Sequence, residues 1–173
     1  MSREYPDEPA DEFPRPPATV TDSQDREVEI RTADEDDLES LVAMYDAFDP
    51  EDRAQGIPPI REEQIRTWLD TLLADDCLNI AASHDGDDIG HATLVPDESD
   101  SYELAIFVLG AYQGAGIGTH LLKHLLGHAQ TEDIEKVWLT VERWNDPAIN
   151  LYKKVGFELC NTESFEIEMT IRL

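Results

Sequence analysis

The chain has 173 residues, which is long enough for one domain with a sizeable hydrophobic core and short for two. Its 39 acidic and 13 basic residues give a formal net charge of −26 at pH 7, so we expect no binding to nucleic acid or anionic membranes, which would repel it. No apolar run approaches the roughly 20 residues that cross a bilayer, and Cys77 and Cys160 lie far apart and outside any metal-like spacing, which favours a reducing, cytoplasmic location.

The first 26 residues contain half of the ten prolines and many acids. This composition predicts a disordered extension rather than a signal or transit peptide. Residues 27–33 alternate between polar and apolar and predict a strand. Residues 34–48 begin with acids suited to a helix N-terminus and have the apolar spacing of an amphipathic helix. A loop at 50–60 leads to a second amphipathic helix over 61–74.

The rest of the chain predicts three consecutive strands, a glycine-rich loop leading into a helix, a further strand, a short helix and two closing strands. These elements fall at residues 77–84, 89–96, 102–109, 116–131, 135–142, 144–156, 157–160 and 165–173. The pattern is mixed α/β without an internal repeat. Because the strands are not regularly interleaved with helices, a doubly wound sheet fits poorly.

The stretch at residues 112–122 reads YQGAGIGTHLL and follows an apolar strand. Glycines between a strand and a helix indicate that the backbone approaches a ligand closely, often a phosphate. A dinucleotide fingerprint would place its third glycine at Thr119 or Leu121, and a P-loop would have a lysine after the glycines, so neither motif matches. A plain glycine turn before a helix is the other interpretation.

Charge is distributed unevenly along the chain. Residues 105–157 contain five basic and five acidic residues, so the region around the glycines is neutral, as an anionic ligand would require. We attribute the acidity elsewhere to a salt-filled cytoplasm, as in proteins of halophilic microbes. Salt at molar strength shortens the Debye length to roughly 3 Å and would screen the repulsion. An acidic surface that steers substrate is the alternative.

The stretch QGAGIG, residues 113–118, resembles the Q/R-x-x-G-x-G/A motif of the GNAT superfamily of N-acetyltransferases. The resemblance implies acetyl-CoA as co-substrate, with backbone N–H groups of the loop and the positive end of the following helix facing the pyrophosphate. No metal is expected. The cofactor contacts are expected from Ile106, Phe107, Val108, Gln113, Gly114, Ala115, Gly116, Ile117, Gly118, Thr119 and Asn145.

A second motif strengthens this resemblance. Residues 145–157 read NDPAINLYKKVGF and match the family pattern N-x-x-A-x-x-L-Y-x-x-x-G-F at every defined position. In the family the asparagine contacts the pantetheine arm and the tyrosine points at the sulfur, which implies these roles for Asn145 and Tyr152. A helix-capping Asn145 and a core Tyr152 are the alternative interpretation. The resemblance covers roughly residues 27–173.

The expected reaction needs a base, because a lysine-like amine with a pKa near 10.4 is almost fully protonated at neutral pH. Glu103 is the first choice, since YELAIFV resembles the E-x-A-x-x-V pattern of protein-lysine acetylating members, and we expect it to be partly buried with a raised pKa. Glu142 is the second choice; another subgroup has its glutamate at the position of Thr140. The resemblance also implies that the backbone N–H of Val108 binds the oxyanion and that Tyr152 protonates the departing thiolate.

We therefore expect a GNAT-like mixed α/β fold over residues 27–173, with a mostly antiparallel, V-shaped, twisted sheet of six or seven strands and about four helices. The expected activity is acetyl transfer from acetyl-CoA to a primary amine of a protein or small molecule, by direct attack in a ternary complex, in a monomer or homodimer. A non-catalytic acetyl-CoA sensor and a toxin-like protein of the same fold are the alternatives. His120, His124 and His128 are expected to form a solvated helix face rather than a metal site.

Overall fold

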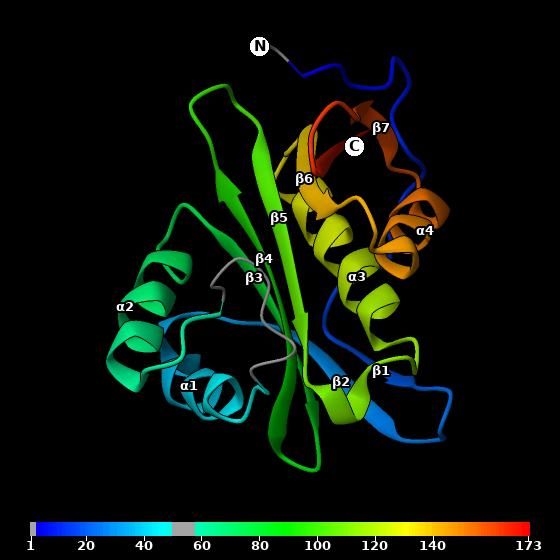
Figure 1. Ribbon diagram of the computed structural model, residues 1–173. Coiled ribbons are helices and arrows are strands. Elements are labelled where there is room, and N and C mark those ends of the chain that lie inside the picture. The colour runs from blue at the N-terminus through cyan, green and yellow to red at the C-terminus, as the bar shows by residue number, and fades with distance from the viewer. Residues whose placement is uncertain (1–2, 50–57) are drawn as a thin grey trace.

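The computed structural model describes residues 3–49 and 58–173, and this part of the chain forms one sheet flanked by helices (Figure 1). Most of the loop expected at 50–60 lies outside the described residues. The sheet within them has eight strands in the order β1-β2-β3-β4-β5-β6-β8-β7, and every neighbouring pair is antiparallel except β5 and β6. The strands are β1 (Ala18–Thr21), β2 (Glu27–Thr32), β3 (Leu78–His84), β4 (Asp87–Pro96), β5 (Tyr102–Val108), β6 (Lys136–Glu142), β7 (Glu158–Asn161) and β8 (Glu166–Arg172).

Helices cover both faces of the sheet (Figure 1). α1 and α2 pack on each other, and α1 contacts β4; α3 packs across β2 to β5 on the opposite face and contacts α4. The helices are α1 (Leu38–Asp46), α2 (Glu62–Leu72), α3 (Ile117–Thr131) and α4 (Asp146–Val155), with short 3-10 turns η1 (Glu35–Asp37) and η3 (Gly110–Tyr112). No helix in the described part of the chain is long and apolar enough to cross a membrane.

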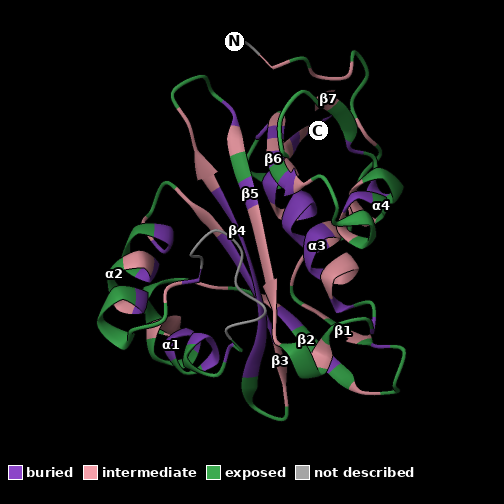
Figure 2. Cartoon of the chain, viewed as in Figure 1, coloured by how far each residue is buried: buried purple, intermediate pink, exposed green. Residues whose placement is uncertain are grey.

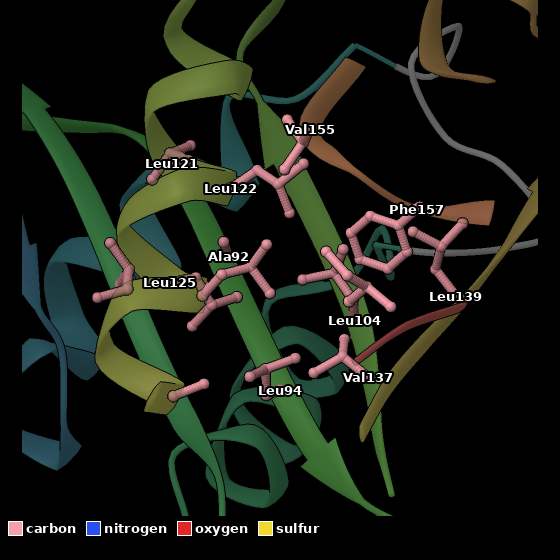
Figure 3. Packing of buried hydrophobic residues seen from close by; sticks show 14 of the residues in the cluster. Ala92, Leu94, Leu104, Leu121, Leu122, Leu125, Val137, Leu139, Val155 and Phe157 are labelled. Carbon is pink, nitrogen blue, oxygen red and sulfur yellow. The ribbon is translucent and has the colours of Figure 1, made fainter. Parts of the chain in front are cut away.

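Two hydrophobic clusters fill the spaces on the two faces of the sheet (Figure 2). The larger cluster lies under α3, where Leu121, Leu122 and Leu125 are fully buried (Figure 3). The smaller cluster surrounds Tyr45 and Leu69 between α1, α2 and the sheet. Because burial of one leucine side chain contributes roughly 1.5–3 kcal/mol, these clusters hold the sheet firmly from both sides.

The sheet divides where its one parallel pair ends. β5 and β6 pair only at Tyr102↔Val137 and Glu103↔Trp138, whereas β5 pairs with β4, and β6 with β8, along their full lengths. The two strands therefore diverge beyond Glu103. The predicted mixed α/β fold with a V-shaped, mostly antiparallel sheet and four helices is confirmed, with eight described strands in place of the six or seven expected.

The additional strand lies in the segment that composition predicted to be disordered, and there the prediction was wrong. Residues 18–21 form β1, which pairs with β2 at Val20↔Val28. Asp22 stabilises the turn after β1, because its carboxylate accepts hydrogen bonds from the backbone N–H of Arg26 at 2.9 Å and from Nε of the same residue at 2.7 Å. This hairpin gives the polar residues local partners that a composition count does not detect.

The chain before β1 also packs on the domain. The backbone N–H of Ala10 donates to the Arg172 carbonyl at 2.7 Å, and that of Phe13 donates to Gln130 Oε1 at 2.9 Å. The chain then crosses α3 so closely that a Cβ at Gly127 would overlap a backbone carbonyl. These partners lie more than 100 positions away in the sequence, so no local pattern reveals them.

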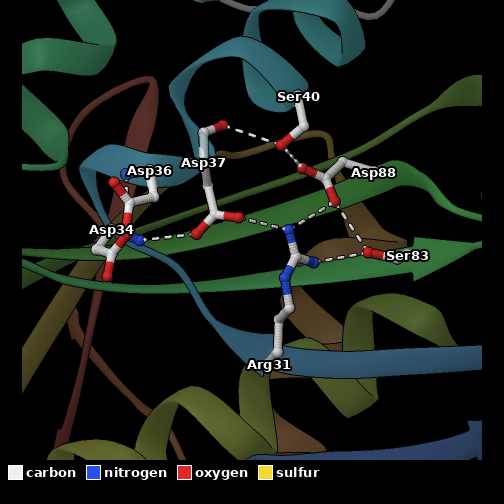
Figure 4. Close-up of polar contacts among 7 residues, drawn as sticks. All are labelled: Arg31, Asp34, Asp36, Asp37, Ser40, Ser83 and Asp88. Atoms are coloured by element: carbon white, nitrogen blue, oxygen red, sulfur yellow. Dashed lines mark hydrogen bonds and ion pairs between the residues drawn. The ribbon is translucent and has the colours of Figure 1, made fainter.

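A polar network fixes the start of α1 against the sheet (Figure 4). The Arg31 guanidinium lies 2.8 Å from a carboxylate oxygen of Asp37, 3.1 Å from one of Asp88 and 2.6 Å from Ser83 Oγ. Ser40 of α1 donates to Asp88 at 2.7 Å. Because Asp88 is almost fully buried, removal of Arg31 would leave an uncompensated charge in the protein interior.

A second buried network links α1 to β3 and β4. The hydroxyl of Tyr45 lies 2.6 Å from His91 Nδ1, and His91 Nε2 lies 2.7 Å from Asn79 Oδ1. Asn79 donates its own amide to the Leu72 carbonyl, so its oxygen must accept and His91 Nε2 must carry the proton. Complete burial lowers the pKa of His91 to about 4, so the ring is neutral at pH 7.

We expect stability to fall as the pH decreases from 6.5 to 4. The unfolded chain takes up a proton on His91 near pH 6.5, whereas the folded chain resists protonation down to about pH 4, which corresponds to about 3 kcal/mol of unfolding free energy. A His91→Gln variant, neutral at every pH, should lose that much less stability than the wild type over this range. Urea unfolding at pH 7 and pH 4 in molar KCl measures the difference, and equal losses would contradict a neutral His91.

Candidate active site

The diverging ends of β5 and β6 border a cleft of about 610 Å³. A hollow of this size suits a small organic ligand. Its walls come from β5, the loop before α3, β6, α4, the start of β8 and one residue after α1. The lining residues are Phe48, Glu103, Leu104, Ala105, Ile106, Phe107, Val108, Tyr112, Gln113, Gly114, Gly116, Gly118, Thr119, Thr140, Val141, Glu142, Asn145, Pro147, Ala148, Leu151, Tyr152 and Glu166.

Alternate backbone amides of β5 face this cleft. Leu109 donates its N–H to the Ile89 carbonyl beside β4 at 3.0 Å. The period of two along a strand therefore turns the N–H groups of Val108 and Ile106 to the other side, toward β6. Both strands lie wholly within the described residues, and β6 pairs only with the first two residues of β5. The amides of Val108 and Ile106 can therefore donate to a ligand.

The loop before α3 presents backbone to the cleft. Gly114 and Gly116 have φ angles of +72° and +91°, a conformation that favours glycine, and a Cβ at either position would meet no atom within 4 Å. Gly116 is the N-cap of α3 and provides no side-chain hydrogen bond. The first amides of a helix lack partners within it and lie at the positive end of its dipole. The loop therefore has the features of a phosphate-binding site.

Two hydrogen bonds hold this loop in place. Gln113 Nε2 donates to the carbonyl of Val108 at 2.9 Å and so connects the loop to β5. The backbone N–H of Ser23, in the turn after β1, donates to the Ala115 carbonyl at 2.9 Å. The hairpin of β1 and β2, which the composition of the first 26 residues did not predict, therefore supports the glycine loop.

α4 supplies the opposite wall of the cleft. Asn145 caps this helix, because its Oδ1 accepts from the backbone N–H of Ala148 at 3.3 Å. Its side-chain amide nitrogen is the group left for a ligand. Tyr152 is partly buried and contacts the Phe157 ring edge-on, and burial raises its pKa to about 12. The Tyr152 hydroxyl therefore keeps its proton at neutral pH.

Three carboxylates line the cleft: Glu103 on β5, Glu142 on β6 and Glu166 on β8. Glu142 and Glu166 are cross-strand partners. Desolvation by the cleft walls raises the pKa of Glu103, Arg3 opposes this rise, and neighbouring carboxylates add to it. The side chain is nevertheless exposed, where we expected partial burial, because Leu104 and not Glu103 turns into the core beneath β5.

The structure gathers most of the sequence-predicted residues around this cleft. Ala115 and Ile117 are the exceptions, since their side chains are buried at 2% and 1% exposure and only their backbone could reach a ligand. The predicted residues that line the cleft are Glu103, Ile106, Phe107, Val108, Gln113, Gly114, Gly116, Gly118, Thr119, Glu142, Asn145 and Tyr152.

Sequence reasoning missed two charged residues of this region. The alternation in FEIEMTIRL places Glu166 on one face of a strand, but only the pairing of β8 with β6 brings it to the cleft. Arg3 acts on Glu103 electrostatically, and it belongs to the segment expected to be disordered. A local pattern could have suggested the strand face of Glu166, whereas none marks Arg3.

The histidines of α3 do not form the expected solvated face. His124 is only 4% exposed, and its Nδ1 donates to the His120 carbonyl at 2.7 Å. The N-terminal segment crosses the same helix one turn later, at Gly127. Among the described residues, no group of three or more His, Cys, Asp or Glu side chains is placed to hold a metal ion.

The sequence of the chain is similar to those of known acetyltransferases. Residues 38–157 match the sequence model of the acetyltransferase (GNAT) family. Mycothiol acetyltransferase of Propionibacterium freudenreichii is 29% identical over 136 residues, which cover 75% of this chain and 42% of that protein. The chain therefore spans less than half the length of this curated relative.

Solved structures share the fold. The GNAT domain of PAT from S. lividans superposes with a TM-score of 0.77 at 20% identity, over 91% of this chain and 97% of that domain. The PaiA N-acetyltransferase of Thermoplasma acidophilum, solved in complex with coenzyme A, has a TM-score of 0.70 at 23% identity, over 84% of this chain and 99% of that protein.

The glycine loop yields a prediction on stability. Gly116→Ala should lower the unfolding free energy by about 1–2 kcal/mol, because an alanine at a φ of +91° is strained. Gly118→Ala is the matched control: its Cβ would meet only Leu151 Cδ2, at an ordinary 3.8 Å. Denaturant unfolding measures both variants. Equal stability of the two would show that the left-handed conformation at Gly116 is not required.

Proposed function

Because the chain belongs to the GNAT acetyltransferase family, we propose that it transfers an acetyl group from acetyl-CoA to a primary amine of a protein or small molecule. One observation carries this proposal. A single cleft joins an anion-binding glycine loop, the exposed amides of β5 and three carboxylates. The first two features suit an anionic acyl donor, and the third suits a cationic acceptor.

The residues of the loop fit the phosphate end of acetyl-CoA. The backbone N–H groups from Gly114 to Thr119 would face the pyrophosphate, with the uncapped start of α3 adding its positive end. The free amide nitrogen of Asn145 would donate to the pantetheine arm. Acetyl-CoA supplies a thioester carbonyl that is already activated toward an amine.

Glu103 is the proposed base. An acceptor amine with a pKa near 10.4 must lose a proton before attack, and the raised pKa of Glu103 makes it a stronger base than an ordinary glutamate. Glu142 remains the second choice, because it lines the other side of the same cleft. The N–H of Val108 would stabilise the negative charge that develops on the carbonyl oxygen during attack.

Tyr152 is proposed to assist the departing sulfur. Burial raises its pKa to about 12, so the hydroxyl keeps its proton at neutral pH. Tyr152 would donate this proton to the sulfur as it departs, the role that the family motif implies.

Acetyl-CoA binding tests the first part of the proposal. In high KCl, calorimetry should detect binding to the wild type and at least a tenfold loss of affinity in Gly118→Trp, because the indole would occupy cleft space beside the loop. Gly118→Ala is the control, since its small side chain leaves this space open. A folded wild type that does not bind acetyl-CoA would refute the proposed function.

The pH profile tests the proposed base. Wild-type kcat/KM should rise with pH as Glu103 loses its proton, with a midpoint above the ordinary 4.5 because its pKa is raised. Glu103→Gln should remove this limb and lower kcat/KM by roughly 10²–10⁴-fold. Glu142→Gln should keep the limb. The reverse result for the two variants would assign the base to Glu142.

A further inference from the structure

Arg3 contacts the side chains of Trp138 on β6 and Glu168 on β8, beside the cleft. Its Cζ is 3.3 Å from the centroid of the Trp138 ring, and one terminal nitrogen is 3.3 Å from Glu168 Oε1. Trp138 is the cross-strand partner of Glu103 on β5. A cation of this chain therefore stacks on an aromatic ring next to the proposed base, in a geometry typical of cation–π binding.

A hydrogen bond fixes the position of the Trp138 ring. Its Nε1–H donates to Asp97 Oδ2 at 2.8 Å. Burial alone would raise the pKa of Asp97, but hydrogen bonds from Ser99, Ser101 and Trp138 outweigh this effect and lower it, so the carboxylate stays ionised. The hydrogen bond to the Asp97 carboxylate therefore fixes the edge of the indole. One face of the ring contacts the Arg3 guanidinium.

Glu103, beside Arg3, lies among further acidic side chains. Desolvation raises the pKa of Glu103, Arg3 lowers it, and Asp97, Glu166 and Glu168 raise it further. Glu103 and Glu166 also line the cleft, so the acidic region is continuous with the proposed reaction site.

The surroundings of the Arg3 side chain leave one of its hydrogen-bond donors unpaired. Arg3 Nε is shielded from solvent and has no hydrogen-bond partner, and a buried donor left unpaired costs about 1–3 kcal/mol. The side chains of Arg3 and Glu168 each remain 25% exposed. A ligand cation with a better fit could therefore displace the guanidinium.

The neighbouring chain does not depend on this side chain for its position. The Glu4 carbonyl accepts from Thr170 Oγ1 at 2.7 Å, and the Pro6 carbonyl accepts from Arg172 Nε at 2.6 Å. The backbone N–H of Glu4 also contacts Cys160 Sγ at 3.2 Å. Because these contacts use the backbone of residues 4–6, the Arg3 side chain can move away from the Trp138 ring while this segment remains in place.

We propose that Trp138 and Glu168, with Glu103 beside them, form a subsite for a second cationic group of the acceptor, and that Arg3 is its resident competitor. The acceptor would carry the amine to be acetylated and, a few bonds away, a guanidinium or ammonium group that stacks on Trp138. This inference rests on the proposed function and narrows its acceptor class to dicationic amines. If Arg3 fills the subsite nine-tenths of the time, its removal strengthens binding about tenfold.

Agmatine and 1-butylamine test the subsite, because they share a four-carbon amine and differ in the guanidinium. Calorimetry on the full chain without acetyl-CoA gives the ratio of their affinities. Arg3→Ala should raise the ratio of agmatine to butylamine affinity about tenfold over the wild type. Arg3→Gln, which keeps a polar side chain, should act in the same direction. Lysyl-arginine amide, titrated in parallel, distinguishes a peptide from a free diamine as the source of the second cation.

The gain must depend on Trp138 and Glu168. In the Arg3→Ala background, Trp138→Leu and Glu168→Gln should each reduce it, with folding of every variant checked by circular dichroism. An unchanged ratio for both agmatine and lysyl-arginine amide in the two Arg3 variants would overturn the subsite, and so would a gain that survives both further substitutions. Acetylation of agmatine and of butylamine by acetyl-CoA, measured separately, tests the proposed function. Acetyl transfer to either amine with an unchanged affinity ratio refutes only the subsite. The expected affinity ratios without transfer to either amine refute only the acetyltransferase.

Discussion

The early end of the parallel ladder between β5 and β6 is the constraint on which the site depends. After two residue pairs the strands part, so the N–H groups of Val108 and Ile106 lose the partners that a continuous sheet would supply. Buried backbone groups need partners, and the cleft satisfies this need only by admitting a ligand or solvent. The opening that weakens the sheet locally is therefore also what creates a binding site.

The rest of the fold keeps this opening from collapsing. Each half of the sheet is paired along its full length with its own neighbours, and hydrophobic clusters brace the two faces. The buried chain from Tyr45 through His91 to Asn79 and the Arg31 network attach α1 at fixed positions. These contacts fix the spacing of the groups that each wall presents to the cleft.

Hydrogen-bond donors and carboxylates lie on different sides of the cleft, although the chain as a whole has a net charge of −26. Its loop side offers backbone amides and the positive end of α3, while Glu103, Glu142 and Glu166 lie along β5, β6 and β8. Such a division matches a negative donor on one side and a positive acceptor on the other. The position of Arg3 on Trp138 fits the same division, because the chain places its own cation on the acidic side.

Local patterns in the sequence determined the elements and most of the site. The glycine spacing from Gly114 to Gly118 and the helix cap at Asn145 are short-range signals, because glycine conformation and helix capping depend on adjacent residues. Tertiary structure alone decided that Glu166 reaches the cleft, that Glu103 stays exposed, and that Arg3 stacks on Trp138. Each of these depends on strand pairing or on contacts between residues far apart in the chain, where the energy comes from partners that no local pattern encodes.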